Sequence, residues 1–273
     1  MPEPAALSCP VPHSRPAADA SASSMSVVRG TLGSMCGRYA QTRAADQLER
    51  DLAIDRILGE HPGPSWNVAP TQDVPVVLER VEDDGPQRQL RQARWGLVPS
   101  WAKDVSIGSR MINARSETVL DKPAFRKAAA KRRALVPMDG YYEWQANERG
   151  PKTPYFLHGA EPLAAAGLYE LWRDHSKADD DPTRWLWTVT IITRPATDSL
   201  GHIHDRCPVL LPGHLWDEWL DPGITAADEV GAMLVNVPEP HLVPREVGRA
   251  VGNVANDGPE LVEPVAPEPE PGA

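Results

Sequence analysis

The chain has 273 residues, of which 41% are hydrophobic and 24% are charged. This composition is typical of globular proteins and excludes a wholly disordered chain or a coiled coil. No run approaches the roughly 18 consecutive apolar residues that predict a membrane-spanning helix, so we expect no membrane association. The net charge of −10 argues against a protein that coats nucleic acid through charge alone, but it leaves room for a local basic groove.

The two ends of the chain differ in composition from its middle. Residues 1–34 and 259–273 hold five prolines each, and the second segment adds four Glu and no Lys or Arg. Such segments bury too little apolar surface to offset the entropy of ordering. We therefore expect a disordered leader over 1–34, which the mature protein lacks, one folded domain over 35–258, and a disordered acidic, proline-rich tail over 259–273.

Within the domain, helical and strand patterns follow one another irregularly. The spacing of Ala45, Leu48 and Leu52 predicts a helix over 41–58, and Pro123 is suited to start a second helix. A short helix carries Leu215. The expected strands are 74–79, 134–138, 141–145, 154–158, 163–172 and 185–193, and an exposed loop covers 173–184. This order indicates an α+β fold with a mainly antiparallel sheet. The tryptophans expected in its core are Trp172, Trp185, Trp187, Trp216 and Trp219.

Charge is concentrated in one stretch. Residues 87–133 carry twelve Lys or Arg and only three Asp or Glu. Trp95 and Trp101 lie among these cations. Cations bind phosphates and aromatic rings stack on unpaired bases, which is what a groove for single-stranded nucleic acid needs. A solvated basic helix beside core tryptophans has the same composition, so charge alone leaves both interpretations open.

The cysteines and histidines are ambiguous when each is taken alone. The three cysteines, Cys9, Cys36 and Cys207, form no Cys-x-x-Cys pair, which disfavours a disulfide framework. Together with the missing apolar signal segment, this predicts a cytoplasmic protein. His202 and His204 alternate along an expected strand near Cys207, as metal ligands do, but no fourth ligand has the usual spacing. We therefore predict no metal and no other cofactor.

Several segments gain meaning from their order and spacing. They are MCGRY (35–39), WNVAPTQ (66–72), RWGLVPSWAKD (94–104), MINARSETV (111–119), VPMDGYYEW (136–144), TIITRPAT (190–197) and GHIHDRCPVLL (201–211). In this combination the sequence resembles the SRAP family, the SOS-response-associated peptidases or abasic-site processing proteins, over about 35–235. The resemblance implies a barrel-like arrangement of mainly antiparallel sheets, flanked by helices. It also implies a protein that traps abasic sites in single-stranded DNA and is associated with the nucleoid at sites of damage, where replication-associated proteins are possible partners. Nothing in the sequence indicates an oligomer, and we expect a monomer.

The resemblance also implies roles for individual residues. Met35 is removed, and the amine and thiol of Cys36 react with the ring-opened sugar aldehyde to give a thiazolidine. Asn113 orients the sugar and the amine, Glu143 acts as acid and base, and His204 transfers protons. The residues expected along the DNA path are Arg38, Asn67, Trp95, Pro99, Ser100, Trp101, Arg115, Thr193 and Arg206.

Elementary chemistry agrees with this assignment. An α-amine has a pKa near ~7.7–8.0, so a useful fraction is neutral and nucleophilic at pH 7. A thiol on the same residue can close a five-membered ring on the imine at high effective concentration. Because 34 residues precede Met35, we expect either that translation starts at Met35 or that the leader is cut away.

The sequence leaves other functions open. Cys36 could instead serve as the N-terminal nucleophile of a peptidase that releases its own leader, as the family's name suggests. The basic stretch could also belong to a non-catalytic binder of single-stranded DNA. Glu143, between Tyr142 and Trp144, could be a plain solvent-side residue of its strand. Lyase activity at the abasic site is a further possibility that the residues do not decide.

Overall fold

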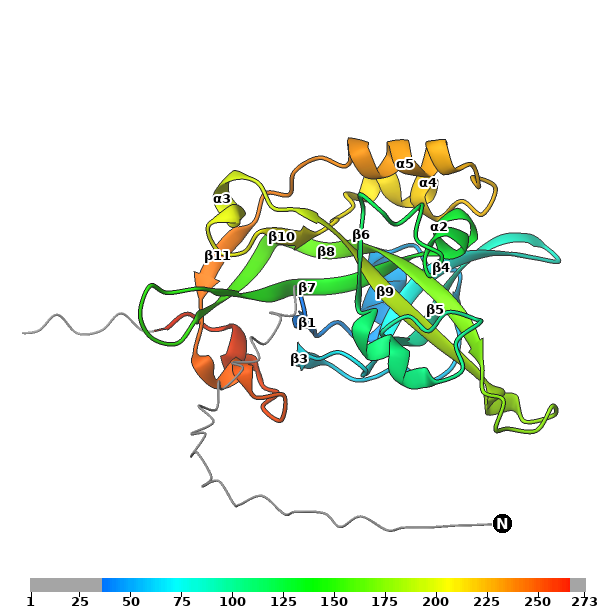
Figure 1. Cartoon of the computed structure of the whole chain (residues 1–273), viewed down its shortest axis with the longest axis horizontal. Coiled ribbons are helices and arrows are strands. Elements are labelled where there is room, and N and C mark those ends of the chain that lie inside the picture. Colours follow the sequence, from blue (N-terminus) through cyan, green and yellow to red (C-terminus); the bar gives the residue numbers. More distant parts are fainter. Residues whose placement is uncertain (1–35, 266–273) are drawn as a thin grey trace, which may run out of the picture. The chain divides into compact units, whose positions relative to one another are not determined.

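The computed structural model describes residues 36–265, except for the side chains of residues 198 and 199 (Figure 1). The strands in chain order are β1 (Tyr39–Gln41), β2 (Arg56–Ile57), β3 (Ser65–Val68), β4 (Asp73–Glu82), β5 (Gly85–Trp95), β6 (Asn113–Arg115), β7 (Arg133–Gln145), β8 (Thr153–Arg173), β9 (Trp185–Pro195), β10 (Arg206–Pro208) and β11 (Val243–Glu246). The helices are α1 (Ala45–Asp51), α2 (Arg126–Lys131), α3 (Asp198–Gly201), α4 (Trp216–Leu220) and α5 (Ala227–Asn236). The expectations for 1–34, Met35 and 266–273 lie outside the described residues.

The long strands form a ring. β8 pairs with β9, β9 with β5, β5 with β4 and β7 with β8, and one residue pair between β4 and β7, Val77 with Leu135, closes the circuit. Most pairings are antiparallel, although β5 and β6 both run parallel to β9. The α+β prediction is confirmed, and the barrel-like arrangement is a ring closed at a single point and not a fully hydrogen-bonded barrel.

Both faces of the ring are buried, and neighbouring residues of each strand enter different cores. Val77 and Leu135 pack in a core that includes residues of α1, α2, α4 and α5. Val76 and Val136 point the other way, into a core that also contains Cys36. Strand side chains alternate in direction, so strands covered on both faces have continuous apolar runs. Figure 1 places α4 and α5 side by side on the helix-covered face.

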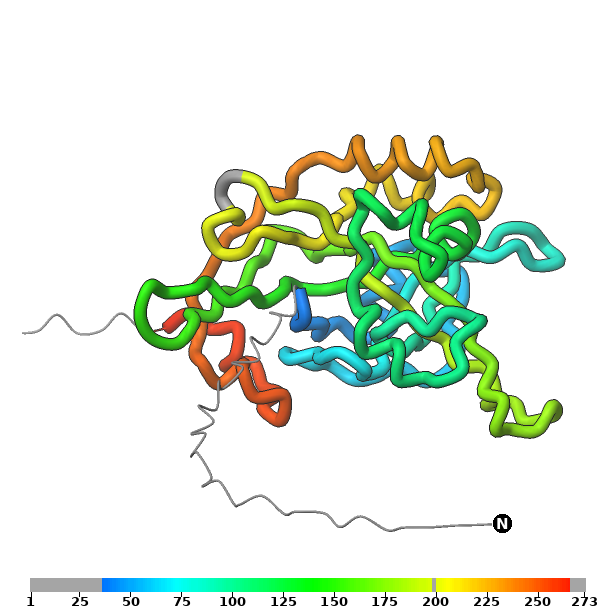
Figure 2. The backbone as a smooth tube through the Cα atoms, in the orientation of Figure 1, coloured from blue at the N-terminus to red at the C-terminus, as the bar shows by residue number. Residues whose placement is uncertain are grey.

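The C-terminal segment returns to the start of the domain. β11 pairs with β8, and the short helical turns η4 (Arg249–Gly252) and η5 (Pro259–Val262) follow it. Figure 2 shows this segment in orange and red, and Arg38, near the start of the described chain, donates to the carbonyl of its residue Val251. The expected disorder from residue 259 is wrong for 259–265, because Leu261 is buried in an apolar cluster.

Several expected elements have different limits in the structure. The first helix ends at Asp51 and Ile57 belongs to β2, and the second begins at Arg126 rather than at Pro123. The expected strand pairs 134–138/141–145 and 154–158/163–172 are single strands, β7 and β8. β5 and α5 were missed. The short helix carrying Leu215 and the exposed loop over 173–184 are confirmed.

The five tryptophans expected in the core differ in how deeply they are buried. Trp172 and Trp219 are buried, and Trp187 and Trp216 are partly buried. Trp185 is exposed, so its expected core position is wrong. No helix among residues 36–265 is long and apolar enough to cross a membrane.

One close backbone approach supplies a stability test. A methyl group added at Gly96, where φ is +130°, would lie 2.5 Å from the carbonyl oxygen of Gly108. We expect Gly96→Ala to lower the free energy of unfolding by about 2–4 kcal/mol in urea titrations. The cost of the clash adds to the cost of placing an alanine at positive φ. Gly150 has φ +96° with open space around it. Gly150→Ala should therefore cost only about 1–2 kcal/mol, and equal losses would contradict the role of the clash.

Candidate functional site

The backbone nitrogen of Cys36 donates a hydrogen bond of 2.6 Å to Oε1 of Glu143. The register of two antiparallel strands produces this contact. β1 pairs with β7 so that Tyr39 lies opposite Tyr141. Two residues further in each direction, Gly37 lies opposite Glu143, which brings Cys36 within reach of the carboxylate. Glu143 is only 3% exposed, so its assignment as a plain solvent-side residue is wrong.

Cys36 has a rare backbone conformation. Its φ is +44°, in the left-handed region that residues other than glycine seldom adopt. Such a conformation costs of order 1–3 kcal/mol and persists where surrounding contacts impose it. For Cys36, this conformation is imposed by the hydrogen bond from its nitrogen to Glu143 and by the packing of its buried side chain.

The thiol of Cys36 is buried and protonated. Its Sγ lies 3.8 Å from the carbonyl oxygen of Arg206. Burial raises the pKa of the thiol well above its ordinary value, and the nearby Glu143 raises it further. Cysteine nucleophiles that act as resting thiolates have the opposite shift. This site therefore holds a neutral thiol beside a buried carboxyl group.

The carboxyl group of Glu143 has its own pKa shift. Burial raises its pKa above the ordinary value, while the neighbouring His204 and the hydrogen bonds from Cys36 lower it in part. Burial disfavours the charged carboxylate, and the hydrogen bonds favour it. The result is a carboxyl group that exchanges its proton closer to neutral pH than an exposed glutamate does.

His204 lies on the turn after α3. The expected strand position of His202 and His204 is wrong, because β10 begins only at Arg206. Nδ1 of His204 lies 3.1 Å from the amide of Arg206 and 3.1 Å from Oδ1 of Asp205. An amide can only donate, so this contact favours the form of the ring with its hydrogen on Nε2, whereas the carboxylate of Asp205 can only accept and favours a hydrogen on Nδ1. Asp205 is exposed and contributes little. Within residues 36–265, no group of three or more His, Cys, Asp or Glu side chains could hold a metal ion.

Asn113 and Arg115 come from β6. This strand runs parallel to β9, with Asn113 opposite Ile191 and Arg115 opposite Thr193. The two side chains share one face because they are two residues apart. Asn113 is partly buried and Arg115 is exposed. The carbonyl just before Asn113, that of Ile112, accepts bonds from the amide of Ile191 and the indole of Trp95.

The residues expected on the DNA path separate into exposed and internal groups. Ser100 and Arg115 are exposed, and Trp101 is 61% exposed. Trp95 has no exposed surface, and its ring packs edge-on against Tyr39 at 5.2 Å. The others are buried or partly buried: Arg38, Asn67, Pro99, Thr193 and Arg206. Direct contact with DNA stays a prediction for all nine, and the exposed three have the most free surface for it in this structure.

Arg38 and Asn67 hold the C-terminal segment. Arg38 donates to the side chain of Asn67 at 2.8 Å and to the carbonyl of Val251 at 2.9 Å. The amide group of Asn67 donates to the carbonyls of Asn253 and Asn256 at 3.0 and 2.7 Å. Sequence reasoning missed this contact, since the backbone carbonyls that accept these bonds carry no residue-specific signal.

The basic stretch also divides in the structure. Arg88 is buried and paired with Glu79, and Arg133 is buried among backbone carbonyls. Arg91 lies over the ring of Trp187. Exposed cations of the stretch are Lys103, Arg110, Arg115, Lys122, Arg126, Lys127 and Lys131. Part of the stretch is therefore structural, and the exposed part keeps the charge that a nucleic-acid surface needs.

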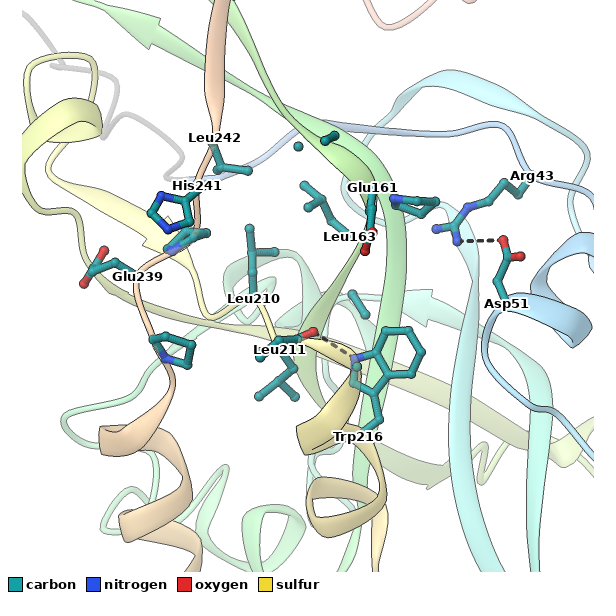
Figure 3. Close-up of a pocket in the computed structure, with 18 residues that line it drawn as sticks. Arg43, Asp51, Glu161, Leu163, Leu210, Leu211, Trp216, Glu239, His241 and Leu242 are labelled. Atoms are coloured by element: carbon teal, nitrogen blue, oxygen red, sulfur yellow. Dashed lines mark hydrogen bonds and ion pairs between the residues drawn. The ribbon is translucent and has the colours of Figure 1, made fainter.

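A separate hollow of about 670 Å³ lies between the bend of β8, the segment after β10 and the segment before β11 (Figure 3). Leu163, Leu210 and Trp216 line it, and the indole of Trp216 is bonded to the carbonyl of Leu211. Its lining in the described chain includes none of the expected site residues. The candidate site is thus the cluster around Cys36, and not this hollow.

The comparisons with known proteins identify the family. The family model for SOS response associated peptidase (SRAP) matches residues 35–254. The abasic site processing protein YoqW of Bacillus subtilis (strain 168) is 37% identical over 233 residues, covering 84% of this chain and 99% of the relative. The abasic site processing protein HMCES of Gallus gallus is 32% identical, covering 85% of this chain and 78% of its own. The chain belongs to the SRAP family, as the motifs indicated.

Solved structures agree on the fold. A protein from Bacteroides thetaiotaomicron matches with a TM-score of 0.68 at 21% identity, covering 85% of this chain and 100% of its own. A phage-related protein from Bordetella bronchiseptica matches with a TM-score of 0.58 at 32% identity, covering 78% of this chain and 94% of its own. The first likeness concerns the fold alone.

The shifted pKa of Glu143 predicts a pH-dependent stability. Because the folded state raises this pKa above the ordinary 4.5, the carboxyl group stabilises the fold below that pH, and the contribution is lost as the pH rises through the folded pKa. Glutamine does not titrate. We expect the free energy of unfolding of the wild type, from urea titrations, to fall relative to that of Glu143→Gln as the pH rises above about 4.5.

Glu117 gives the opposite control. Its hydrogen bonds with Arg206 lower its pKa to about 2. The ionised Glu117 therefore stabilises the fold at pH values above its pKa in the unfolded chain. This stabilisation is lost as the pH falls through its pKa in the folded protein. The wild type should therefore lose stability relative to Glu117→Gln on acidification. A pH-independent difference for Glu143→Gln would contradict the assigned shift.

Proposed function

We propose that this chain, like its relatives named abasic site processing proteins, recognises abasic sites in DNA. We further propose that it acts on single strands and captures the lesion covalently through Cys36 as the N-terminal residue. The observation that carries the proposal is the contact of 2.6 Å between the Cys36 nitrogen and the buried Glu143, on a residue whose thiol is also held in the site.

The proposed reaction conserves atoms and needs no redox partner. The neutral amine of Cys36 adds to the aldehyde carbon of the ring-opened sugar, and loss of one water gives an imine. The thiol then adds to the imine carbon, and its proton moves to the nitrogen. The product is a thiazolidine, with one new C–N bond and one new C–S bond. Both nucleophiles are on one residue, which makes ring closure intramolecular and favourable.

The neighbouring groups fit the proton transfers. Glu143 is placed to accept a proton from the Cys36 ammonium and to return it as the hydroxyl leaves as water. Its raised pKa suits a group that must alternate between acid and base. With its hydrogen on Nε2, the form that the amide of Arg206 favours, His204 can donate to the sugar oxygen as the ring opens. Asn113, at the start of β6, is proposed to orient the sugar.

The reaction requires that no residue precede Cys36. An amide nitrogen does not attack an aldehyde, and a thiol alone gives only a reversible hemithioacetal. The backbone conformation of Cys36 supports the proposed free terminus. The angle φ is defined by the carbonyl carbon of the preceding residue, so a residue at the free N-terminus has no φ. The left-handed φ of +44° at Cys36 is a strain that exists only while a residue is attached, and cleavage before Cys36 would release it.

The exposed residues suggest where the strand lies. Trp101 offers a ring for stacking on a base next to the lesion, and Arg115 offers a cation two residues beyond Asn113. A peptidase that uses Cys36 as a resting thiolate is less well supported, because the pKa of this thiol is raised and not lowered.

The test is incubation of two forms of the protein with single-stranded DNA that carries one abasic site, followed by denaturing electrophoresis. The form that starts at Met35 and loses it should give a shifted, heat-stable band, whereas a form that retains residues 1–35 should give none. Intact mass of each form before the reaction identifies its first residue.

Variants separate the two nucleophiles of Cys36. Cys36→Ala keeps the amine, so it should form an imine that borohydride traps, but no stable band without borohydride. Cys207→Ala removes the other buried cysteine and should crosslink like the wild type. A stable band from Cys36→Ala, or from undamaged DNA, would refute the proposed thiazolidine, and salt-sensitive binding without any covalent band would favour a simple binder.

A further inference from the structure

The side chain of Arg206 joins three segments of the site. Both terminal nitrogens of its guanidinium bond to the carboxylate of Glu117, with Nη2 at 3.0 Å. Nη2 also donates to the carbonyl and the hydroxyl of Thr193, at 2.7 and 3.2 Å. Arg206 lies at the start of β10, Thr193 lies on β9, and Glu117 follows β6. A fork-shaped guanidinium with fixed partners on both sides is a rigid connection.

The backbone of Arg206 contacts the two proposed reactive side chains. Its amide donates to Nδ1 of His204 at 3.1 Å, and its carbonyl oxygen lies 3.8 Å from Sγ of Cys36. The first contact favours the form of His204 with its hydrogen on Nε2. The second gives the thiol a fixed acceptor. A shift of this one peptide segment would change the geometry of both groups together.

Glu117 is the partner that completes the connection. It lies four residues after Asn113, on the segment that carries this proposed sugar-orienting residue. The pKa of its carboxyl group is lowered to about 2 by the hydrogen bonds from Arg206, so the pair stays charged at any physiological pH. The bond from Glu117 to Arg206 therefore holds the Asn113 segment against the segment of His204.

We propose that Glu117 is a positioning residue, which holds Arg206 so that His204, the Cys36 thiol and Asn113 keep their mutual geometry. This inference rests on the proposed covalent capture. It also assigns to the Arg206 guanidinium an internal role, beside the direct contact with DNA that the family resemblance implied.

The two roles of Arg206 predict opposite effects of removing Glu117. If the guanidinium mainly binds phosphate, Glu117 competes with the DNA for it and repels the strand. Loss of the negative charge would then strengthen binding and steepen its salt dependence. If Glu117 positions the site, its loss leaves affinity nearly unchanged and slows the reaction of the bound DNA.

The experiment measures single-turnover crosslinking of Glu117→Gln over a range of concentrations of DNA with one abasic site. The protein is used in the form whose first residue is Cys36. We expect the rate constant at saturating DNA to fall about tenfold or more, because small displacements of reacting groups have effects of this size. The half-saturating concentration should stay within about twofold of the wild type.

A control comes from a second ion pair that also joins a buried arginine to a glutamate. Arg88 bonds to Glu79 at 2.7 Å and is likewise held on two sides, but it lies outside the site. Glu79→Gln should change the rate constant less than about twofold. A thermal melt of each variant checks its folding, and Glu117→Asp, which can retain the ion pair, should recover part of the lost rate.

A second readout does not depend on the crosslink. Nitrogen chemical shifts of His204, from ¹⁵N-histidine labelling of the full chain, report which ring nitrogen carries the hydrogen. We expect mainly the Nε2–H form in the wild type and in Glu79→Gln, and a mixture of both forms in Glu117→Gln. A structural loss elsewhere would not change this ratio.

The outcomes are distinct. Tighter DNA binding by Glu117→Gln with an unchanged rate constant, or an unchanged His204 ratio in a folded variant, overturns the positioning role. If the wild type itself forms no crosslink, the proposed function fails, whereas the His204 ratio still decides whether Glu117 positions this ring.

Discussion

The site depends on the pairing of β1 with β7. Glu143 and Cys36 are separated by 107 positions in the chain, and a shift of this register by one residue would turn the carboxyl group to the opposite face of its strand. Specific contacts hold the register: Tyr39, opposite Tyr141, packs edge-on against Trp95 at 5.2 Å, and the amide of Thr42 donates to Asp139 of β7 at 2.7 Å. The contact at the Cys36 nitrogen is therefore as firmly determined as the core itself.

Burial is also what gives the site its chemical character. A glutamate and a thiol are removed from water next to one another, and each shift in pKa follows from that removal. Burial raises both the pKa of the thiol and the pKa of the carboxyl group, so the carboxyl group takes up and releases a proton more readily near neutral pH than an exposed glutamate does. The same environment makes an activated thiolate unfavourable, which is why an aminothiol condensation suits this cysteine better than thiolate catalysis.

Around this centre, several charged residues act on other parts of the protein and not on solvent. Arg206 connects β10, β9 and the segment after β6, while Arg38 and Asn67 fasten the C-terminal segment beside β1. These connections come from residues far apart in sequence. They leave a smaller set, Trp101, Arg115 and their exposed cationic neighbours, with free surface for the proposed contact with a nucleic acid.

The sequence by itself determined the family, the α+β class and most of the long strands. Motif spacing predicted Cys36, Asn113, Glu143 and His204 as the reactive residues, and of these the structure shows the contact between Cys36 and Glu143. It could not decide which side chains face inward. Trp95 and Trp101 have the same local signature, yet one is enclosed and the other exposed. The partners of Arg206 and the burial of Leu261 likewise depend on contacts between distant segments, and only the tertiary structure brings those segments together.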